Sequence, residues 1–301
     1  MSDQALHVFQ KLVEDSLDDH ILYNLTPIEV FEPMVYSLES KGKRLRPTML
    51  LATLWLLDVD RLDHGISSAL ALEYIHTYSL IHDDLPAMDD DDFRRGKPSA
   101  HQKYNEATAI LSGDGLLTDA FNIIVADEQV SDHEKVQLVL ELSEAAGPRG
   151  MVAGQVYDMK LDNETGTLQE IQKMHSLKTG QLFKFAVRAA GVIGNASDEQ
   201  QELLDRFAIF FGRGFQIHND LMDATSDQEV TGKETGQDSV HNKLTYTSLL
   251  GIEGAIIELA METEKAREAV DQLTEISGRD FSLLKTFLTY LELPEQVGTD
   301  E

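Results

Sequence analysis

The chain has 301 residues, no cysteine and a formal net charge of −28 at pH 7, with an isoelectric point near 4.6. A surface this acidic repels nucleic acid and anionic lipid, and the lack of cysteine excludes disulfides and thiolate metal sites. No secretion signal is visible, and the longest apolar run, LLATLWLL, is far too short to span a bilayer. We therefore expect a cytoplasmic protein with no nucleic-acid partner and no stable membrane insertion.

The composition predicts an all-α fold. None of the seven prolines lies between residues 149 and 293, and a proline-free stretch rich in Leu, Ala, Glu, Gln and Lys favours helices. Apolar residues recur at helical spacing over 168–190 and 199–224, whereas strand-like alternation with hairpin turns is missing. We expect a single domain over residues 1–301, built as a bundle of roughly ten or more helices.

Two stretches, 49–57 and 206–215, are apolar on more than one helical face. Helices of this kind lie either at the centre of a large bundle or along the wall of an apolar cavity. The sequence leaves both arrangements open.

A helix predicted over residues 66–84 ends in the first of two acidic clusters, HDDLPAMDDDD. At 100° per residue, His76 and Asp83 share one face of this helix, and Asp84 lies next to that face. The loop that follows can fold Asp89 back toward Asp83. Carboxylates at this spacing suit a hard cation such as Mg²⁺, which is normally shared with phosphate oxygens.

Basic residues follow the acidic cluster at once, in FRRGKP (93–98). Arg94 and Arg95 offer forked donors that fit phosphate in bidentate fashion. Together the two parts predict a clamp for a metal ion and a diphosphate. A solvated acidic loop before a basic helix start is the alternative; an EF-hand loop is absent, and the pair His82–Asp83 is a weak sign of a phosphohydrolase.

A second polar stripe is expected on the helix that contains FGRGFQIHNDLMDATSD (211–227). Its oxygen-bearing side chains recur every three to four residues. They are Gln216, Asn219, Asp220, Asp223 and Asp227. Because the helix is otherwise apolar, these groups require a cation or a cavity, unless they form a solvated face.

Lys178, Lys233 and Lys243 add scattered positive charge, as does the basic stretch KGKRLRP (41–47). Taken singly, each lysine is sufficiently explained as a surface residue. Together with the two acidic stripes, the cations indicate two phosphate-bearing substrates, or one diphosphate held by several Mg²⁺ ions.

Several stretches, in this order, resemble the trans-isoprenyl diphosphate synthases, and among them the short-chain bacterial farnesyl and geranylgeranyl diphosphate synthases. They are GKRLRP, LIHDDLPAMDDDDFRRGKPS, KTGQLF and GFQIHNDLMDATSD with the later GK and NKLTY, and the similarity covers residues 38–252. The resemblance implies the isoprenoid synthase fold, a helical bundle around a deep apolar cavity, in a homodimer with three Mg²⁺ ions per active site. It also implies head-to-tail condensation of isopentenyl diphosphate with an allylic diphosphate, dimethylallyl or geranyl, in isoprene biosynthesis.

The resemblance assigns the site residues by motif. The metal ligands are Asp83, Asp84 and Asp89, with Asp223 from the second stripe. The isopentenyl diphosphate site is Lys43, Arg46, His76 and Arg95. The allylic diphosphate site is Arg94, Lys178, Thr179, Gln216, Lys233 and Lys243. The catalytic residues are Lys178, Thr179 and Gln216, and the allylic carbocation lies near the Thr179 hydroxyl and the Gln216 side chain.

The second motif departs from the family pattern. It normally reads Asp-Asp-x-x-Asp, but here it is NDLMD, with Asn219 at the first position. The third metal ion is therefore expected to bind more weakly, with Asp223 and Asp227 supplying carboxylates in place of the missing one. The same string resembles the second motif of terpene cyclases, and a non-catalytic subunit of a heteromeric prenyl synthase is the other rival. The tail, LELPEQVGTDE, is acidic where many relatives are basic, so we do not expect it to close over diphosphate.

Tyr78 and Ser79 are expected to set the length of the product. Tyr78 lies five residues before Asp83, so its Cα is roughly 7.5 Å deeper along the helix. An aromatic ring at that depth can form a floor for the growing chain, and Ser79 beside it is small. In the family, this pattern goes with farnesyl diphosphate as the main product. Geranylgeranyl diphosphate is the alternative if Tyr78 only packs in the core.

Overall fold

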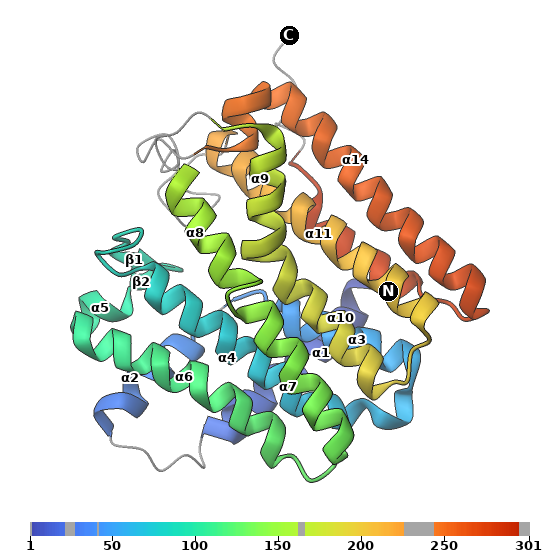
Figure 1. The fold of residues 1–301 in the computed structure, drawn as a ribbon, viewed down its shortest axis with the longest axis horizontal. Helices are drawn as coiled ribbons and strands as arrows, with labels where there is room; N and C mark the ends of the chain where they lie inside the picture. Colours follow the sequence, from blue (N-terminus) through green and yellow to red (C-terminus); the bar gives the residue numbers. More distant parts are fainter. Residues whose placement is uncertain (1, 22–27, 41, 162–165, 226–243, 295–301) are drawn as a thin grey trace. The chain divides into compact units, whose positions relative to one another are not determined.

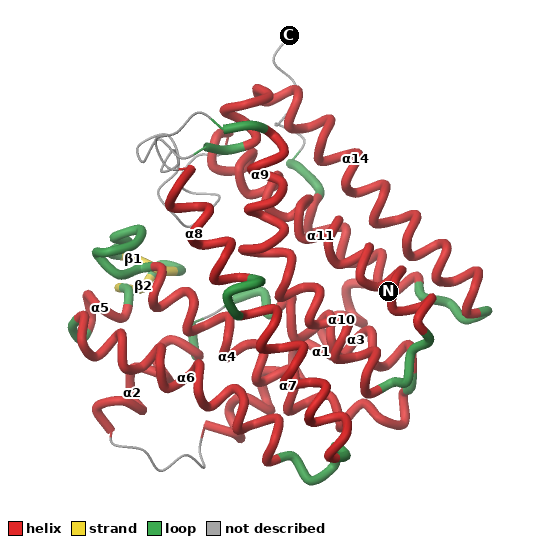
Figure 2. The backbone as a smooth tube through the Cα atoms, in the orientation of Figure 1, coloured by secondary structure: helices red, strands yellow, loops and turns green. Residues whose placement is uncertain are grey.

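The computed structural model describes residues 2–21, 28–40, 42–161, 166–225 and 244–294. They are helical almost throughout, with one ribbon of two short strands (Figure 2), which confirms the all-α prediction. The chain forms two compact units. One is Met1–Leu142 with Ala189–Asn195, and the other is Ser143–Arg188 with Ala196–Glu301. That the whole chain is a single domain stays a prediction.

The first unit is built around one central helix. Its elements are α1 (Ser2–Ile21), α2 (Ile28–Leu38), α3 (Leu45–Leu57), a 3₁₀ segment (Val59–Gly65), α4 (Ile66–Asp83), β1 (Phe93–Arg94), β2 (Lys97–Pro98), α5 (Ala100–Lys103), α6 (Glu106–Ala126) and most of α7 (Asp132–Ala146). α4 packs against α1, α2, α3 and α6, and Figure 1 shows α4 and α6 side by side. Since α4 is buried along most of its length, the aspartates at its end project from a fixed core.

The second unit contains two long helices that pack along each other, α11 and α14 (Figure 1). Its elements are α8 (Met151–Leu161), α9 (Leu168–His175), a π-turn (Ser176–Gly180), the first part of α10 (Gln181–Ile193), α11 (Asp198–Thr225), α14 (Tyr246–Ser277) and a 3₁₀ segment (Ser282–Leu291). α14 begins at a capping box, in which Thr245 Oγ1 accepts from the Ser248 N–H at 3.1 Å. It ends at Gly278, whose φ of 60° suits glycine.

Core packing explains the two stretches that are apolar on several faces. In α3, Met49 and Leu50 are fully buried. In α11, the ring of Phe211 lies edge-on to Phe183 with centroids 4.9 Å apart and stacks on Phe207 at 6.1 Å. Both stretches therefore belong to the core of their own unit.

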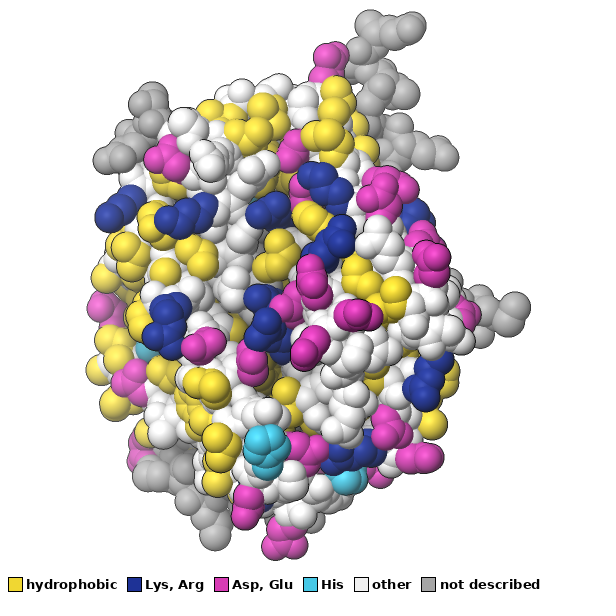
Figure 3. Space-filling model, turned by 45° about the vertical axis from the view of Figure 1, so that its right-hand side comes forward, with side chains coloured by type: hydrophobic (Ala, Val, Ile, Leu, Met, Phe, Trp, Pro, Cys, Tyr) yellow, Lys and Arg dark blue, Asp and Glu magenta, His cyan; other side chains and the backbone are white. Residues whose placement is uncertain are grey.

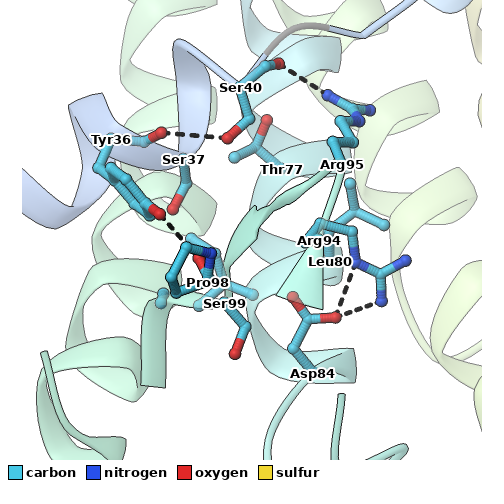
Figure 4. Close-up of a pocket in the computed structure, with 12 residues that line it drawn as sticks. Tyr36, Ser37, Ser40, Thr77, Leu80, Asp84, Arg94, Arg95, Pro98 and Ser99 are labelled. Carbon is cyan, nitrogen blue, oxygen red and sulfur yellow. Dashed lines mark hydrogen bonds and ion pairs between the residues drawn. The ribbon is translucent and has the colours of Figure 1, made fainter. Parts of the chain in front are cut away.

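The basic stretch after the aspartates forms a ribbon and not the start of a helix. β1 and β2 pair antiparallel, with Arg94 opposite Lys97. Arg95 and Gly96 make the turn, with φ angles of 54° and 75°, a conformation that glycine adopts readily and arginine rarely. Figure 4 shows the guanidinium groups of Arg94 and Arg95 pointing away from each other. The turn therefore directs the two cations to different partners.

One helix among the described residues, α6, is long and apolar enough to cross a membrane by length and composition alone. Gly113 and Asp114 interrupt its apolar run, so the longest uninterrupted apolar run of the chain lies elsewhere. Only 39% of its most apolar 18-residue window is buried. The helix nevertheless packs along α4 and carries Asp114 and Asp119, which are costly in a bilayer. The absence of membrane insertion stays a prediction.

The excess of acidic residues is distributed over the surface. Figure 3 shows Asp and Glu side chains between basic and apolar ones across the face that it draws. Several acids are paired, as in Arg61–Glu134 at 2.7 Å and Arg188–Asp205 at 2.8 Å. Scattered charge of this kind favours solubility and does not mark a binding site.

Candidate active site

The loop after α4 returns to the end of that helix. The Asp89 N–H donates to the Asp83 carbonyl at 2.9 Å, and the Met88 N–H donates to the Leu85 carbonyl at 2.8 Å. Asp84 is buried, with 3% of its surface exposed, while Asp83 and Asp89 are half-buried. The loop therefore folds Asp89 back toward Asp83, and that these residues bind metal stays a prediction.

Arg94 holds the carboxylate of Asp84. Its Nε donates to Asp84 Oδ1 at 2.8 Å, and its Nη2 makes a closer contact with the same oxygen (Figure 4). Nη2 also donates to Asp91 Oδ2 at 3.0 Å. Burial raises the pKa of Asp84 in spite of the arginine; burial lowers the pKa of Arg94, but the hydrogen bond and charge of Asp84 outweigh it and raise that pKa. A residue predicted to bind metal and one predicted to bind diphosphate are therefore joined to each other.

The donor atoms at the end of α4 fit a hard cation. Asp83, Asp84 and Asp89 offer carboxylate oxygens, the ligands that Mg²⁺ prefers, and the chain has no thiolate to offer a softer metal. Within the described ranges, no three carboxylates or imidazoles converge as a ready-made metal cage. Because Arg94 contacts Asp84 through Oδ1, a cation that binds Asp84 would use Oδ2 or compete with the arginine for Oδ1.

A second group of cations surrounds His76 in α4. Arg46 Nη1 lies 3.3 Å from His76 Nε2, and Arg95 Nη1 donates to the Ser40 carbonyl at 2.9 Å. Burial, followed by the charges of Arg46 and Arg95, holds the pKa of His76 well below its usual 6.5. Burial also lowers the pKa of Arg46, to about 10. At neutral pH the imidazole is therefore neutral and the guanidinium is charged.

The other residues of the basic stretch before α3 have different surroundings. Arg44 is buried, forms a close ion pair with Glu73 of α4 and donates to the Leu38 carbonyl. Lys43 is exposed, and its backbone carbonyl accepts from Gln10 Nε2 at 3.1 Å. Arg44 therefore makes contacts within the core, while its neighbour Lys43 is accessible to a ligand.

Arg95 lies directly against the backbone of Gly42. A Cβ at Gly42 would come within 2.4 Å of Arg95 Nη1. A cavity of about 30 Å³ next to the ribbon is lined in part by Ser37, Ser40 and Thr77 (Figure 4). This volume holds about one or two water molecules, and Asp84, Arg94 and Arg95 also line it.

Lys178 and Thr179 lie in the π-turn between α9 and α10. Lys178 Nζ forms a close ion pair with Asp158 of α8, and Thr179 is buried. α8 comes so near that a Cβ at Gly154 would lie 2.2 Å from the backbone nitrogen of Lys178. π-turns of this kind are frequent at functional sites.

The second polar stripe divides between two sides of α11. Gln216, Asn219 and Asp223 share a side by their spacing, and the Asn219 Nδ2 donates to Gln216 Oε1 at 3.4 Å. Asp220 is buried instead and accepts from the Tyr246 N–H at 2.9 Å, in the first turn of α14. Asp220 therefore caps the start of α14. Among the described residues of the stripe, Asp223 is the carboxylate on the side of α11 that was predicted to bind metal.

Tyr78 is buried in the first unit. Its ring lies edge-on to that of His82, with centroids 5.7 Å apart, and burial raises the pKa of Tyr78 to about 12. The Ser79 Oγ donates to the His76 carbonyl at 2.8 Å. A buried ring fits a floor for the product as well as core packing, so the role of Tyr78 in chain length stays a prediction.

The structure adds one acidic residue that the sequence analysis missed. Asp158 holds Lys178, twenty positions further along the chain. A signal for it was present, because Gln155 and Asp158 lie at helical spacing in a stretch of small and apolar residues. Helical spacing along the sequence does not show, however, which residues of different helices contact each other. The predicted residues Asp227, Lys233 and Lys243 lie outside the described residues.

Comparison with known proteins shows the family. Residues 28–277 match the polyprenyl synthetase family. The chain is 45% identical to the farnesyl diphosphate synthase of Geobacillus stearothermophilus over 88% of this chain and 90% of that protein. It is 37% identical to geranylgeranyl pyrophosphate synthase 7 of Arabidopsis thaliana, over 92% and 78%. Its fold is similar to that of a geranyltransferase from Helicobacter pylori complexed with magnesium and isoprenyl diphosphate, with a TM-score of 0.80 and 29% identity over 93% and 95% of the two chains. The chain therefore belongs to the polyprenyl synthetase family.

Proposed function

We propose that this chain is a Mg²⁺-dependent prenyltransferase that condenses isopentenyl diphosphate with dimethylallyl or geranyl diphosphate, and that its main product is farnesyl diphosphate. The observation that carries the proposal is the meeting of Asp84 and Arg94 at the end of α4, in a member of this family. A carboxylate for a metal and a guanidinium for phosphate are thereby held at one point. The higher identity to a farnesyl than to a geranylgeranyl enzyme supports the fifteen-carbon product.

The acidic residues are proposed as the metal site. Asp83, Asp84, Asp89 and Asp223 would hold Mg²⁺ through their carboxylate oxygens. Bound Mg²⁺ supplies positive charge that stabilises the departing diphosphate. We propose three ions per site, the third bound least tightly because Asn219 offers a carbonyl oxygen without charge.

The cations around His76 are proposed to bind isopentenyl diphosphate. Arg46 and Arg95 carry the positive charge, and exposed Lys43 adds to it. A neutral His76 offers a hydrogen-bond donor without a further charge, since burial and the nearby Arg46 lower the pKa of the ring. These four side chains therefore recognise the diphosphate and keep the isopentenyl group free to react.

The allylic diphosphate is assigned to Arg94, Lys178, Thr179 and Gln216, together with Lys233 and Lys243, which lie outside the described residues. The allylic C–O bond breaks, the isopentenyl double bond forms the new C–C bond, and a proton passes to the departing diphosphate. Lys178 stabilises the leaving anion, while the oxygen dipoles of Thr179 and Gln216 stabilise the cation. Apolar surroundings keep water from capturing the cation.

We propose a homodimer that covers exposed apolar side chains on α6 and on α7. Ile110 and Leu111 on α6 and Val136 and Leu140 on α7 expose between 42% and 69% of their surface. Contact with a second copy removes this apolar area from water, which stabilises the dimer by about 25 cal/mol per Å² buried. It also accounts for the apolar character of α6 in a protein that we propose to act in the cytoplasm. Light scattering should show a dimer that Leu111→Glu with Val136→Glu dissociates; a monomeric parent would refute this state.

The proposal is tested by product analysis of the purified chain. It is incubated with Mg²⁺, isopentenyl diphosphate and each allylic diphosphate in turn, and the products are identified by chain length. Farnesyl diphosphate is expected. A twenty-carbon product identifies a geranylgeranyl diphosphate synthase, and a cyclic hydrocarbon a terpene cyclase. Turnover that requires a second, different chain identifies a non-catalytic subunit.

A further inference from the structure

A line of polar side chains in the second unit connects α14 with the π-turn. Glu262 of α14 stands at one end, Arg213 of α11 in the middle, and Ser176, the first residue of the π-turn, at the other end. None of the three was predicted to bind substrate or metal. Their contacts lead instead to the two residues of the turn that were.

Backbone contacts hold the middle and the end of the π-turn. A Cβ at Gly154 of α8 would lie 2.2 Å from the Lys178 nitrogen, and one at Gly212 of α11 would lie 2.9 Å from the Gly180 Cα. The turn therefore has no room to move toward either helix. Its start is held by side chains.

Arg213 holds that start through the hydroxyl of Ser176. Its Nε donates to Ser176 Oγ at 2.8 Å, and the same hydroxyl donates to the Gln172 carbonyl at 2.6 Å. The hydroxyl thus joins Arg213 to the last turn of α9, where the regular helix gives way to the wider turn. Lys178 and Thr179 follow directly, so the conformation at Ser176 determines how both side chains are presented.

Glu262 in turn lies beside Arg213. Its side chain is 1% exposed, its Oε2 lies 3.8 Å from Arg213 Nη1, and its Oε1 accepts from Lys265 Nζ at 2.6 Å. The Arg213 side chain is 26% exposed, and an ion pair at this distance contributes little to stability. The buried carboxylate nevertheless attracts the guanidinium toward α14 while its Nε donates to Ser176.

We infer that Arg213 is a positioning residue for the allylic substrate, because through Ser176 it sets the conformation in which the π-turn presents Lys178 and Thr179. The inference rests on the proposed function, which places these two residues at the allylic diphosphate. Arg213 acts through the turn and does not touch the substrate. Its loss therefore impairs use of the allylic diphosphate and spares isopentenyl diphosphate, whose proposed ligands belong to the first unit.

Two variants, called the link variants, remove the hydrogen bond between Arg213 and Ser176, one from each side. Arg213→Met removes the donor at similar length, and Ser176→Ala removes the acceptor. Arg188→Met is the matched control, because Arg188 pairs with Asp205 in the same unit at 2.8 Å and lies eight positions beyond the end of the π-turn. The parent and the three variants are compared by hydrogen–deuterium exchange and by steady-state kinetics with each substrate varied in turn.

The link variants should show faster exchange over residues 176–181, by about tenfold, and the control should not. The KM for the allylic diphosphate should rise about tenfold in both, while the KM for isopentenyl diphosphate stays within about twofold. A merely structural Arg213 would lower the melting temperature of Arg213→Met and Arg188→Met alike and shift both KM values together.

Unchanged exchange over 176–181 in the link variants overturns the inference, and so does an equal change in the two KM values. If Arg213→Met does not fold, Ser176→Ala decides, since it removes only a hydroxyl. If the parent forms no prenyl product at all, the proposed function fails separately. Hydrogen–deuterium exchange then still tests whether Arg213 positions the turn. So does calorimetry, which measures the affinity for inorganic diphosphate with Mg²⁺.

Discussion

Asp84 and Arg94 lie ten positions apart in the sequence and meet at 2.8 Å, a carboxylate at the end of α4 and a guanidinium on the ribbon that follows. Each neutralises the other in a buried place, where either charge alone would be costly. The proposed metal ligand, Asp84, and the proposed diphosphate ligand, Arg94, are thus bound to each other, and changing either residue affects both.

Removing Arg94 should destabilise the protein in a way that Mg²⁺ reverses. Arg94→Met leaves the Asp84 carboxylate buried without its partner, which should lower the free energy of unfolding by about 3 kcal/mol. Urea unfolding with and without Mg²⁺ measures the loss and its recovery. Arg149→Met is the control: Arg149 pairs with Glu144 on the surface and should contribute less than about 1 kcal/mol. Equal losses in the two variants would contradict the pairing.

Asp83 should be required for turnover and not for folding. Asp83→Ala removes a proposed metal ligand from the half-buried end of α4, so the rate with Mg²⁺ should fall by orders of magnitude, on the order of 10³-fold. Circular dichroism checks the fold. Asp90→Asn is the control, because Asp90 is exposed in the same loop and asparagine tolerates its φ of 54°. A near-normal rate in Asp83→Ala would disprove the metal assignment.

Asn219→Asp should lower the Mg²⁺ concentration that gives half-maximal rate. Asn219 is exposed on the same side of α11 as Gln216 and Asp223, so the change adds an anionic ligand where the structure provides one carboxylate among its described residues. We expect a shift of about fivefold to tenfold, measured as rate against Mg²⁺ concentration. An unchanged or higher requirement would exclude this position from the metal site.

Tyr78→Ala should lengthen the product. Removing the ring beside His82 opens space along α4, so the chain can grow beyond fifteen carbons. Tyr78→Phe keeps the ring and should keep the product. Chromatography of the prenyl products compares the parent with both variants. A parent that makes mainly the twenty-carbon product, or an alanine variant with no longer products, would show that Tyr78 only packs in the core.

His175 should make the folded state sensitive to acid. Burial lowers the pKa of His175 to about 4, against 6.5 for the free side chain, so the unfolded state takes up a proton first as the pH falls. The free energy of unfolding is therefore unaffected above pH 6.5, falls between pH 6.5 and 4 by about 3 kcal/mol, and levels off below.

The histidine is tested against a variant that keeps its packing. His175→Phe retains a ring against Tyr246, whose centroid lies 5.4 Å away. Urea unfolding from pH 4 to 8 should give two curves that diverge below pH 6.5, with the parent falling more steeply. Parallel curves would mean that another group titrates.

The sequence predicted what local spacing controls. The carboxylates at the end of α4 and the return of Asp89 follow from helical periodicity and a short loop. Spacing did not distinguish Arg44, which pairs with Glu73 on another helix, from Arg46, which lies at the proposed site. It also did not reveal the ribbon at 93–98, because two-residue strands are too short for an alternating pattern.

The π-turn at Ser176–Gly180 also bears on how the helix that contains it can have evolved. A π-turn accommodates one residue more than an α-helical turn, so it corresponds to a single insertion whose effect stays inside one turn. Deleting one residue from 176–180 would restore a regular helix and leave α9 and α10 in their places, whereas a deletion elsewhere in the helix would rotate every later side chain by about 100°. The segment that carries Lys178 and Thr179 is thus a place inside a helix where the chain can gain or lose a residue without disturbing the core of the second unit.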